Sequence, residues 1–136
     1  MAALGLETVM REVDDEIRGL ERALPGHDLS LQPTVDQALR LANRLMLAFA
    51  QSAGRPLHIG EDYDPLEVFK AFVKGDPSLN AIRDNVRELV YYRNCLSSGR
   101  EDALPLNPIA MAVRTIRHIY LYVRTRAIKE HGLKEA

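Results

Sequence analysis

The segment from residue 34 to residue 50 constrains the fold most, because its apolar side chains cover a wide surface of the helix that their spacing predicts. One stripe recurs at steps of three and four, and it consists of Val35, Ala38, Ala42, Leu45 and Phe49. Further apolar side chains widen this surface, namely Leu39, Leu41, Met46 and Leu47. A helix with so wide an apolar surface must be covered by other elements, so we expect it at the centre of the fold.

Two signals predict where the first two helices lie. The first helix carries a stripe at four-three spacing and ends at Pro25-Gly26; its members are Leu6, Met10, Val13, Ile17, Leu20 and Leu24. Thr34 and Gln37 have the spacing of a capping box, which predicts that the second helix begins at Thr34.

Proline pairs predict the starts of the remaining helices, since Asp or Asn can cap a helix whose first position is proline. These pairs are Asp64-Pro65, Asp76-Pro77 and Asn107-Pro108, and the segments that they open end near Gly75, Gly99 and Gly132. Residues 54–64 are rich in glycine and acidic side chains, so we expect a surface loop there.

Strands are not predicted, because alternation of period two is never sustained along the chain. Four long helices and one short helix, joined by short loops, most simply form an up-and-down bundle. At 136 residues the chain has the length of one domain, so the sequence predicts a single all-α domain over residues 1–136.

Composition restricts the function. The net charge of −1 provides no overall attraction to nucleic acid or to an anionic membrane. Cys95 is the only cysteine, so an intrachain disulfide is excluded and a reducing, cytoplasmic setting is expected. The longest apolar run, Leu45–Ala50, is too short to span a bilayer. The four histidines are dispersed in sequence, and we expect no metal site and no cofactor.

Charge is distributed unevenly between the two ends of the chain. Residues 1–32 hold seven acidic residues against three arginines, whereas residues 108–136 hold six basic residues against two glutamates. We expect the first and last helices to lie near each other, with these charges paired weakly on solvated faces. The alternative interpretation is a basic strip on the last helix that binds RNA or an acidic partner.

Arg93 interrupts an apolar stripe in the fourth predicted helix. The stripe consists of Leu79, Ile82, Val86, Leu89, Arg93 and Leu96. A guanidinium on a buried face requires a carboxylate, several acceptors or a wet cavity, so Arg93 indicates either a structural ion pair or a site. In the structural interpretation, Arg93 pairs with Glu88 or with an acid on another helix, while Asn94 and the serines help to end the helix before Gly99.

The segment from Arg93 to Gly99 resembles the motif of HEPN domains. These are small helical bundles common in prokaryotic toxin-antitoxin, abortive-infection and RNA-processing systems, and their motif is an arginine, a polar residue often asparagine, a short spacer and then His-Gly. Arg93, Asn94 and Gly99 match this motif, but Ser98 stands in the position of the histidine. A looser arginine-spacer-histidine pattern, Arg126 with His131, lies at the end of the last helix, where a cation also complements the helix dipole.

The resemblance implies a metal-independent ribonuclease in active members, with the arginine stabilising the phosphate transition state, the histidine transferring protons, and two motifs meeting across a dimer. Serine cannot replace imidazole in proton transfer near neutral pH. For this chain the resemblance therefore implies binding, dimerisation or regulation, with Arg93, Asn94 and Ser98 as candidate binding residues.

Two functional hypotheses follow. The first is a non-catalytic helical interaction or regulatory module that forms a homodimer and has no assigned catalytic residue. The second is a HEPN-like RNA-binding domain or weak ribonuclease that uses Arg93 and Asn94.

Overall fold

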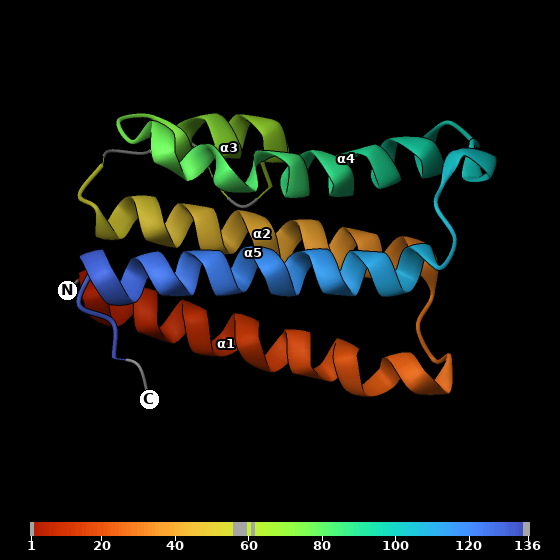
Figure 1. Cartoon of the computed structure of the whole chain (residues 1–136), viewed down its shortest axis with the longest axis horizontal. Helices are drawn as coiled ribbons and strands as arrows, with labels where there is room; N and C mark the ends of the chain where they lie inside the picture. The colour runs from red at the N-terminus through yellow and green to blue at the C-terminus, as the bar shows by residue number, and fades with distance from the viewer. Residues whose placement is uncertain (1, 56–59, 61, 135–136) are drawn as a thin grey trace.

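The computed structural model describes residues 2–55, 60 and 62–134, with side chains from residue 5 onward (Figure 1). Its α-helices are α1 (Ala2–Ala23), α2 (Leu31–Ser52), α3 (Pro65–Val73), α4 (Arg83–Ser97) and α5 (Pro108–Glu130). Short 3₁₀ helices occupy Leu24–Gly26, Pro77–Ile82 and Glu101–Ala103. The described residues contain no strand, so the predicted all-α bundle of four long helices and one short helix is confirmed.

The four long helices alternate in direction along the chain, and α3 with α4 covers the side of α2 that lies opposite α1 (Figure 1). Within this arrangement α2 contacts all four other α-helices, while α5 contacts α1, α2 and α4. The expectation that the second helix is central is therefore confirmed.

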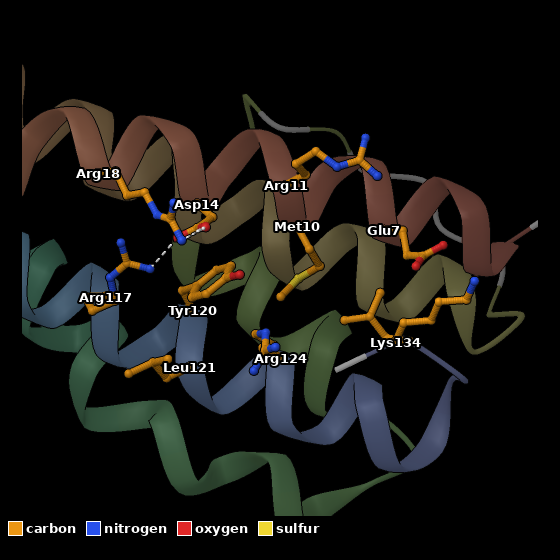
Figure 2. Close-up of a pocket in the computed structure, with 11 residues that line it drawn as sticks. Glu7, Met10, Arg11, Asp14, Arg18, Arg117, Tyr120, Leu121, Arg124 and Lys134 are labelled. Atoms are coloured by element: carbon orange, nitrogen blue, oxygen red, sulfur yellow. Dashed lines mark hydrogen bonds and ion pairs between the residues drawn. The ribbon is translucent and has the colours of Figure 1, made fainter. Parts of the chain in front are cut away.

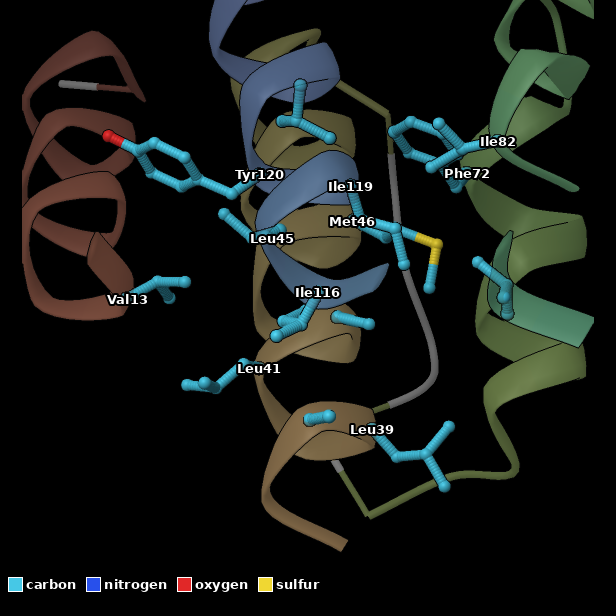
Figure 3. Close-up of a cluster of buried hydrophobic side chains, with 14 of the residues drawn as sticks. Val13, Leu39, Leu41, Leu45, Met46, Phe72, Ile82, Ile116, Ile119 and Tyr120 are labelled. Atoms are coloured by element: carbon cyan, nitrogen blue, oxygen red, sulfur yellow. The ribbon is translucent and has the colours of Figure 1, made fainter. Parts of the chain in front are cut away.

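Burial of α2 explains this arrangement. Every residue from Leu45 to Ala50 is buried, so this part of the helix is covered on all sides. Figure 3 shows Leu45 directed toward α1 and Met46 directed toward the side of α3 and α4. Leu45 and Met46 have no exposed surface, which makes α2 the element around which the others pack.

One predicted helix start and one predicted cap are wrong in detail. α2 begins at Leu31, three residues before Thr34, and the Thr34 hydroxyl donates to the Ser30 carbonyl oxygen at 2.6 Å. Thr34 therefore lies inside the first turn of α2. Asn107 precedes α5 as predicted, but it adopts φ +55° and its side chain makes no capping hydrogen bond. Pro108, with its fixed φ and missing N–H, still suits the first position of α5.

The starts at Asp64 and Asp76 are confirmed as caps. The Asp64 carboxylate accepts from the Leu66 N–H at 2.8 Å and so caps α3. The Asp76 carboxylate accepts from the Ser78 N–H at 3.2 Å, but the segment that it caps is a 3₁₀ helix that leads into α4. Residues 54–64 connect α2 to α3, and residues 56–59 and 61 of this predicted loop lie outside the described residues.

Arg55 secures the end of α3. Its Nη1 donates to the carbonyl oxygens of Ala71, Phe72 and Lys74 at 2.6, 2.8 and 2.6 Å. A cation at a helix C-terminus pairs with carbonyl groups that have no partner inside the helix. Arg55 therefore acts as a structural cap that the sequence pattern did not predict.

Cys95 is buried, and none of the described helices is long and apolar enough to cross a membrane.

His131 follows α5 and packs against the core. Its ring stacks on Phe49 with ring centroids 4.2 Å apart, and its Nδ1 is buried with no hydrogen-bond partner among the described residues. Burial lowers the pKa of His131 below its ordinary value of 6.5, and the positive charges of Arg55 and Arg126 lower it further, whereas Glu130 opposes the shift. The folded state therefore disfavours the protonated imidazole.

We predict that this histidine makes the protein less stable in mild acid. Because the pKa is lower in the folded state than in the unfolded state, the unfolded chain binds the proton first as the pH falls below about 6.5, and the free energy of unfolding decreases. His131→Phe keeps the stacking on Phe49 and should make this decrease shallower in denaturant titrations at pH 7.5, 6.0 and 5.0. His118→Phe, at an exposed position on α5, is the control and should leave the decrease unchanged. Parallel decreases in the wild type and His131→Phe would contradict the assignment.

Candidate cleft between the first and last helices

Arg93 lies at the edge of the bundle. Leu79, Ile82, Val86 and Leu89 have no exposed surface, but the stripe becomes partly exposed at Arg93. The Arg93 side chain is 32% exposed, and its Nη2 lies 3.7 Å from the carboxylate of Asp64, which is 51% exposed. The partner is thus an acid from the start of α3 rather than Glu88, which accepts hydrogen bonds from the hydroxyls of Tyr92 and Thr115. An ion pair this long and this exposed contributes little to stability.

Ser98 and Gly99 end α4. The Ser98 hydroxyl donates to the Asn94 carbonyl oxygen at 2.6 Å. The Gly99 N–H donates to the Leu96 carbonyl oxygen at 3.3 Å and the Arg100 N–H to that of Cys95 at 2.7 Å, with Gly99 at φ +69°. These bonds form a Schellman motif, in which glycine supplies the left-handed conformation. Through these contacts Ser98 and Gly99 help to end α4, which is the structural role predicted for them. The Asn94 side chain is exposed. The HEPN-like resemblance stays a prediction.

Arg126 joins α5 to the start of the Pro77–Ile82 3₁₀ helix. Its Nη2 is 2.6 Å from the Asp76 carboxylate, its Nη1 donates to the hydroxyls of Ser78 and Tyr122, and its Nε pairs with Glu130. His131 does not share this cluster, because its ring stacks on Phe49. Arg126 is therefore a structural residue whose donors are occupied.

An ionic cluster of Arg117, Asp14, Glu21 and Arg18 joins α5 to α1, and we call this cluster the Arg117 clasp. Its Nε and Nη2 donate to the two carboxylate oxygens of Glu21 at 3.0 and 2.8 Å, and its Nη1 donates to Asp14 at 2.7 Å. Arg18 reaches the other oxygen of Asp14 at 3.2 Å. The paired N–H groups match the geometry of a carboxylate, and such bidentate pairs are stronger than single contacts. The predicted proximity of the first and last helices is confirmed, but the pairing at Arg117 is closer and more buried than the weak pairing on solvated faces that we expected.

The clasp fixes the charge states of its members. Hydrogen bonds from Arg117 hold the pKa of Glu21 below its usual value, and the hydrogen bonds to Glu21 and Asp14 raise the pKa of Arg117. The guanidinium of Arg117 also lies 5.1 Å from the centroid of the Tyr120 ring, within the range of a cation–π contact. At neutral pH, therefore, the clasp is a closed ionic cluster beside Tyr120.

Beyond the clasp, α1 and α5 border an open cleft of about 480 Å³. Figure 2 shows Arg18, Asp14 and Arg117 toward one end, Glu7 and Lys134 toward the other, and Met10, Tyr120 and Arg124 between them. The lining combines apolar with charged side chains. The apolar members are Met10, Tyr120, Leu121 and Leu133. The cationic members are Arg11, Arg18, Arg117, Arg124 and Lys134, and the acidic ones are Glu7 and Asp14.

The cleft has an excess of positive charge. Asp14 is held by Arg18 and Arg117, and Arg117 is held again by Glu21, so these charges largely offset one another. The further lining charges are cationic at Arg11, Arg124 and Lys134 and acidic at Glu7 alone. Cations gathered at a concave surface with apolar walls create a positive local potential. The net charge of the whole chain, −1, conceals this local excess.

Tyr120 is the hydroxyl-bearing side chain of this lining. It is 7% exposed, and burial raises its pKa, so its hydroxyl stays protonated at neutral pH and can donate a hydrogen bond. The described residues form no group of three or more potential metal-ligating side chains that could hold an ion. In chemical terms, the arrangement supplies donors and positive charge to an anion.

Only one feature of the sequence pointed to this cleft. The opposite charges of the two ends indicated that α1 and α5 meet, and the alternative interpretation of those charges was a basic strip on the last helix. Two members of that strip, Arg117 and Arg126, form ion pairs, and Arg117, Arg124 and Lys134 line the cleft with Arg11 of α1. No protein-family model matches this chain, and no curated protein or solved structure matches it.

We predict that Arg117 contributes more to stability than Arg93. Arg117→Ala removes three hydrogen bonds to carboxylates from a side chain that is 20% exposed, and should lower the free energy of unfolding by about 1–2 kcal/mol. Arg93→Ala removes one long, exposed contact and should change it by less than about 0.5 kcal/mol. Urea denaturation of both variants measures the difference. A larger loss of unfolding free energy in Arg93→Ala than in Arg117→Ala would contradict this prediction.

Proposed function

We propose that this chain is a non-catalytic interaction module that binds an anionic group in the α1–α5 cleft. The observation that carries the proposal is the excess of cationic side chains around a preformed cleft of about 480 Å³. This volume lies within the roughly 300–1,000 Å³ typical of small-molecule sites. The described lining residues include no cysteine, histidine or serine, which supports binding in place of nucleophilic or imidazole catalysis.

The cleft residues are expected to contribute to anion binding in different ways. Arg11 and Arg124 present guanidinium groups, which suit the paired oxygens of phosphate or carboxylate, and Lys134 adds a mobile positive charge. The Arg117 clasp holds α5 beside α1, which keeps the lining residues of the two helices together at one cleft. Glu7 disfavours a second negative charge beside it, so the anionic group is expected nearer to Arg11 and Arg124.

We predict that pyrophosphate binds to the wild-type protein and that binding weakens with added salt. Arg11→Gln combined with Lys134→Gln should weaken it about tenfold or more, since losing roughly 1.4 kcal/mol corresponds to a factor of ten. The matched control, Arg87→Gln combined with Lys74→Gln, makes the same charge change at exposed positions on α4 and after α3. This control should bind within twofold of the wild type in isothermal titration calorimetry.

The same titration tests the HEPN-like alternative. Arg93→Gln should leave pyrophosphate binding unchanged if the cleft is the site. Loss of binding in Arg93→Gln, with normal binding in Arg11→Gln/Lys134→Gln, would contradict the proposed function and favour the motif at the end of α4. Absence of any pyrophosphate binding by the wild type would also contradict it.

A second observation favours self-association, as the homodimer hypothesis requires. A hollow of about 360 Å³ at the end of the bundle is lined mainly by apolar side chains, among them Leu24, Leu29, Leu31 and Ile109. Leu106, which directly precedes the lining residues Asn107 and Pro108, is 91% exposed. A projecting apolar side chain beside an apolar hollow is self-complementary under two-fold symmetry, so we propose a second copy of this chain as its partner.

We predict that Leu106→Asp shifts the protein from dimer to monomer in light scattering after size-exclusion chromatography. A charge introduced into an apolar contact must be desolvated, which weakens association. Leu121→Asp, at a leucine that is 50% exposed on another face, is the control and should leave the mass unchanged. A wild-type protein that is monomeric at high micromolar concentration would contradict self-association.

A further inference from the structure

The chain turns back on itself directly after α5. The His131 and Leu133 N–H groups both donate to the Ala127 carbonyl oxygen, at 2.9 and 3.3 Å, and Gly132 between them adopts φ +71°. Glycine supplies this left-handed conformation without steric cost. Figure 1 shows the chain after α5 running toward the N-terminal end of α1, whose residues share the cleft lining with Leu133 and Lys134.

The two ends of the segment 131–134 have different surroundings. At its start, the His131 ring stacks on Phe49 of α2, with ring centroids 4.2 Å apart. At its end, Lys134 is exposed and lines the α1–α5 cleft. Leu133 between them is 8% exposed and belongs to the buried core. The segment therefore connects the core to the cleft, and any role that it has in anion binding rests on the proposed function.

A protonated imidazole finds little to stabilise it at this position. The described charged groups that act on the His131 ring are Glu130 and Arg126 of α5 and Arg55 after α2. Glu130, the one acid of this set, is already paired with Arg126, and Arg55 is held in place by three backbone carbonyl oxygens. Burial is the largest cause that disfavours the charged ring, and the two guanidinium charges add to it. Protonation therefore favours a conformation in which the ring has left the core.

We propose that residues 131–134 form a latch, in which neutral His131 holds Lys134 at the anion cleft and protonation of His131 releases the segment. Release removes one of the cations that line the cleft, so the anion binds more weakly. Freeing four residues restores backbone entropy, which offsets the lost burial of Leu133 and of the ring. The closed and released forms therefore lie close in free energy, and one proton shifts the balance between them.

His131 is a positioning residue in this proposal, because it acts on the anion through Lys134. The sign of the pH effect distinguishes this role from direct contact. A protonated imidazole that stayed in place would add a positive charge to the protein and strengthen anion binding. Release of the latch weakens binding as the pH falls below about 6.5, the ordinary pKa of histidine.

Calorimetric titration with pyrophosphate at pH 7.5 and pH 5.0 tests the latch in the wild type and in His131→Phe. Phenylalanine keeps the ring on Phe49 and cannot be protonated. At pH 7.5 the two proteins should bind within twofold of each other. At pH 5.0 the wild type should bind at least threefold more weakly than His131→Phe, up to a limit of about 30-fold, because this pH lies about 1.5 units below 6.5. Protonation of pyrophosphate cancels, since both proteins meet the same ligand at each pH.

Two further comparisons separate the latch from a general effect of acid. His118→Phe, at an exposed position on α5, should keep the pH profile of the wild type. Lys134→Gln should bind more weakly at pH 7.5. Adding His131→Phe to Lys134→Gln should then change the affinity at pH 5.0 by less than twofold, since the cation that the latch positions is absent.

Nuclear magnetic resonance of the wild type tests release without a substitution. Between pH 7.5 and pH 5.0 the backbone amide shifts of residues 132–134 should move toward random-coil values, while those of residues 35–50 in α2 stay unchanged. Far-ultraviolet circular dichroism should show that the helices are retained at pH 5.0. Unchanged shifts of residues 132–134, or unfolding of the whole bundle, would overturn a local latch.

The titrations also separate the latch from the proposed function. Equal affinities of the wild type and His131→Phe at pH 5.0 would overturn the latch and leave the anion site intact. Tighter binding by the wild type at pH 5.0 would overturn it as well, because the protonated imidazole would then have stayed in place. Absence of pyrophosphate binding at pH 7.5 would overturn the anion site itself, and the latch with it.

Discussion

Burial of α2 determines how the other helices are arranged. Its run from Leu45 to Ala50 is buried without interruption, so no face of this part of the helix is left for water. Removing that apolar surface from water requires a neighbour on each side, and α1, α3, α4 and α5 all contact α2. The short α3 serves this requirement together with α4, and Arg55 secures its end by donating hydrogen bonds to three carbonyl oxygens.

The cleft is a consequence of this packing. α1 and α5 both cover α2 and also contact each other, and their solvent-facing residues meet along an outer seam. α1 contributes acidic residues to this seam and α5 contributes arginines, so the Arg117 clasp forms where the helices approach closely. Where the seam opens, Arg11, Arg124 and Lys134 line the same cleft together with Glu7. A surface produced by core packing thereby gains a local positive charge, on which the proposed binding depends.

Helices and caps, which depend on regular local spacing, could be predicted from the sequence. Contacts between segments far apart in the chain could not. The stripes of α1 and α2 predicted the bundle, and Asp64 and Asp76 predicted caps, because both signals are local. Thr34 had the spacing of a capping box, but α2 begins at Leu31 and the Thr34 hydroxyl donates back to the Ser30 carbonyl oxygen, so Thr34 lies inside the first turn. Arg93 was expected on a buried stripe, yet the last turns of α4 reach the edge of the bundle, where no other helix covers them fully. The cleft combines residues from positions 7 to 134, and only their charge asymmetry was visible in the sequence.

The most direct test of the account is to locate the anion site by nuclear magnetic resonance. Uniformly ¹⁵N-labelled protein is titrated with pyrophosphate, and backbone amide shifts are followed residue by residue. The account predicts that the largest changes fall at residues 7–14 of α1, at residues 117–124 of α5 and at residues 133–134, while residues 93–98 of α4 stay unchanged. Changes concentrated at residues 93–98, or no saturable change anywhere, would contradict it.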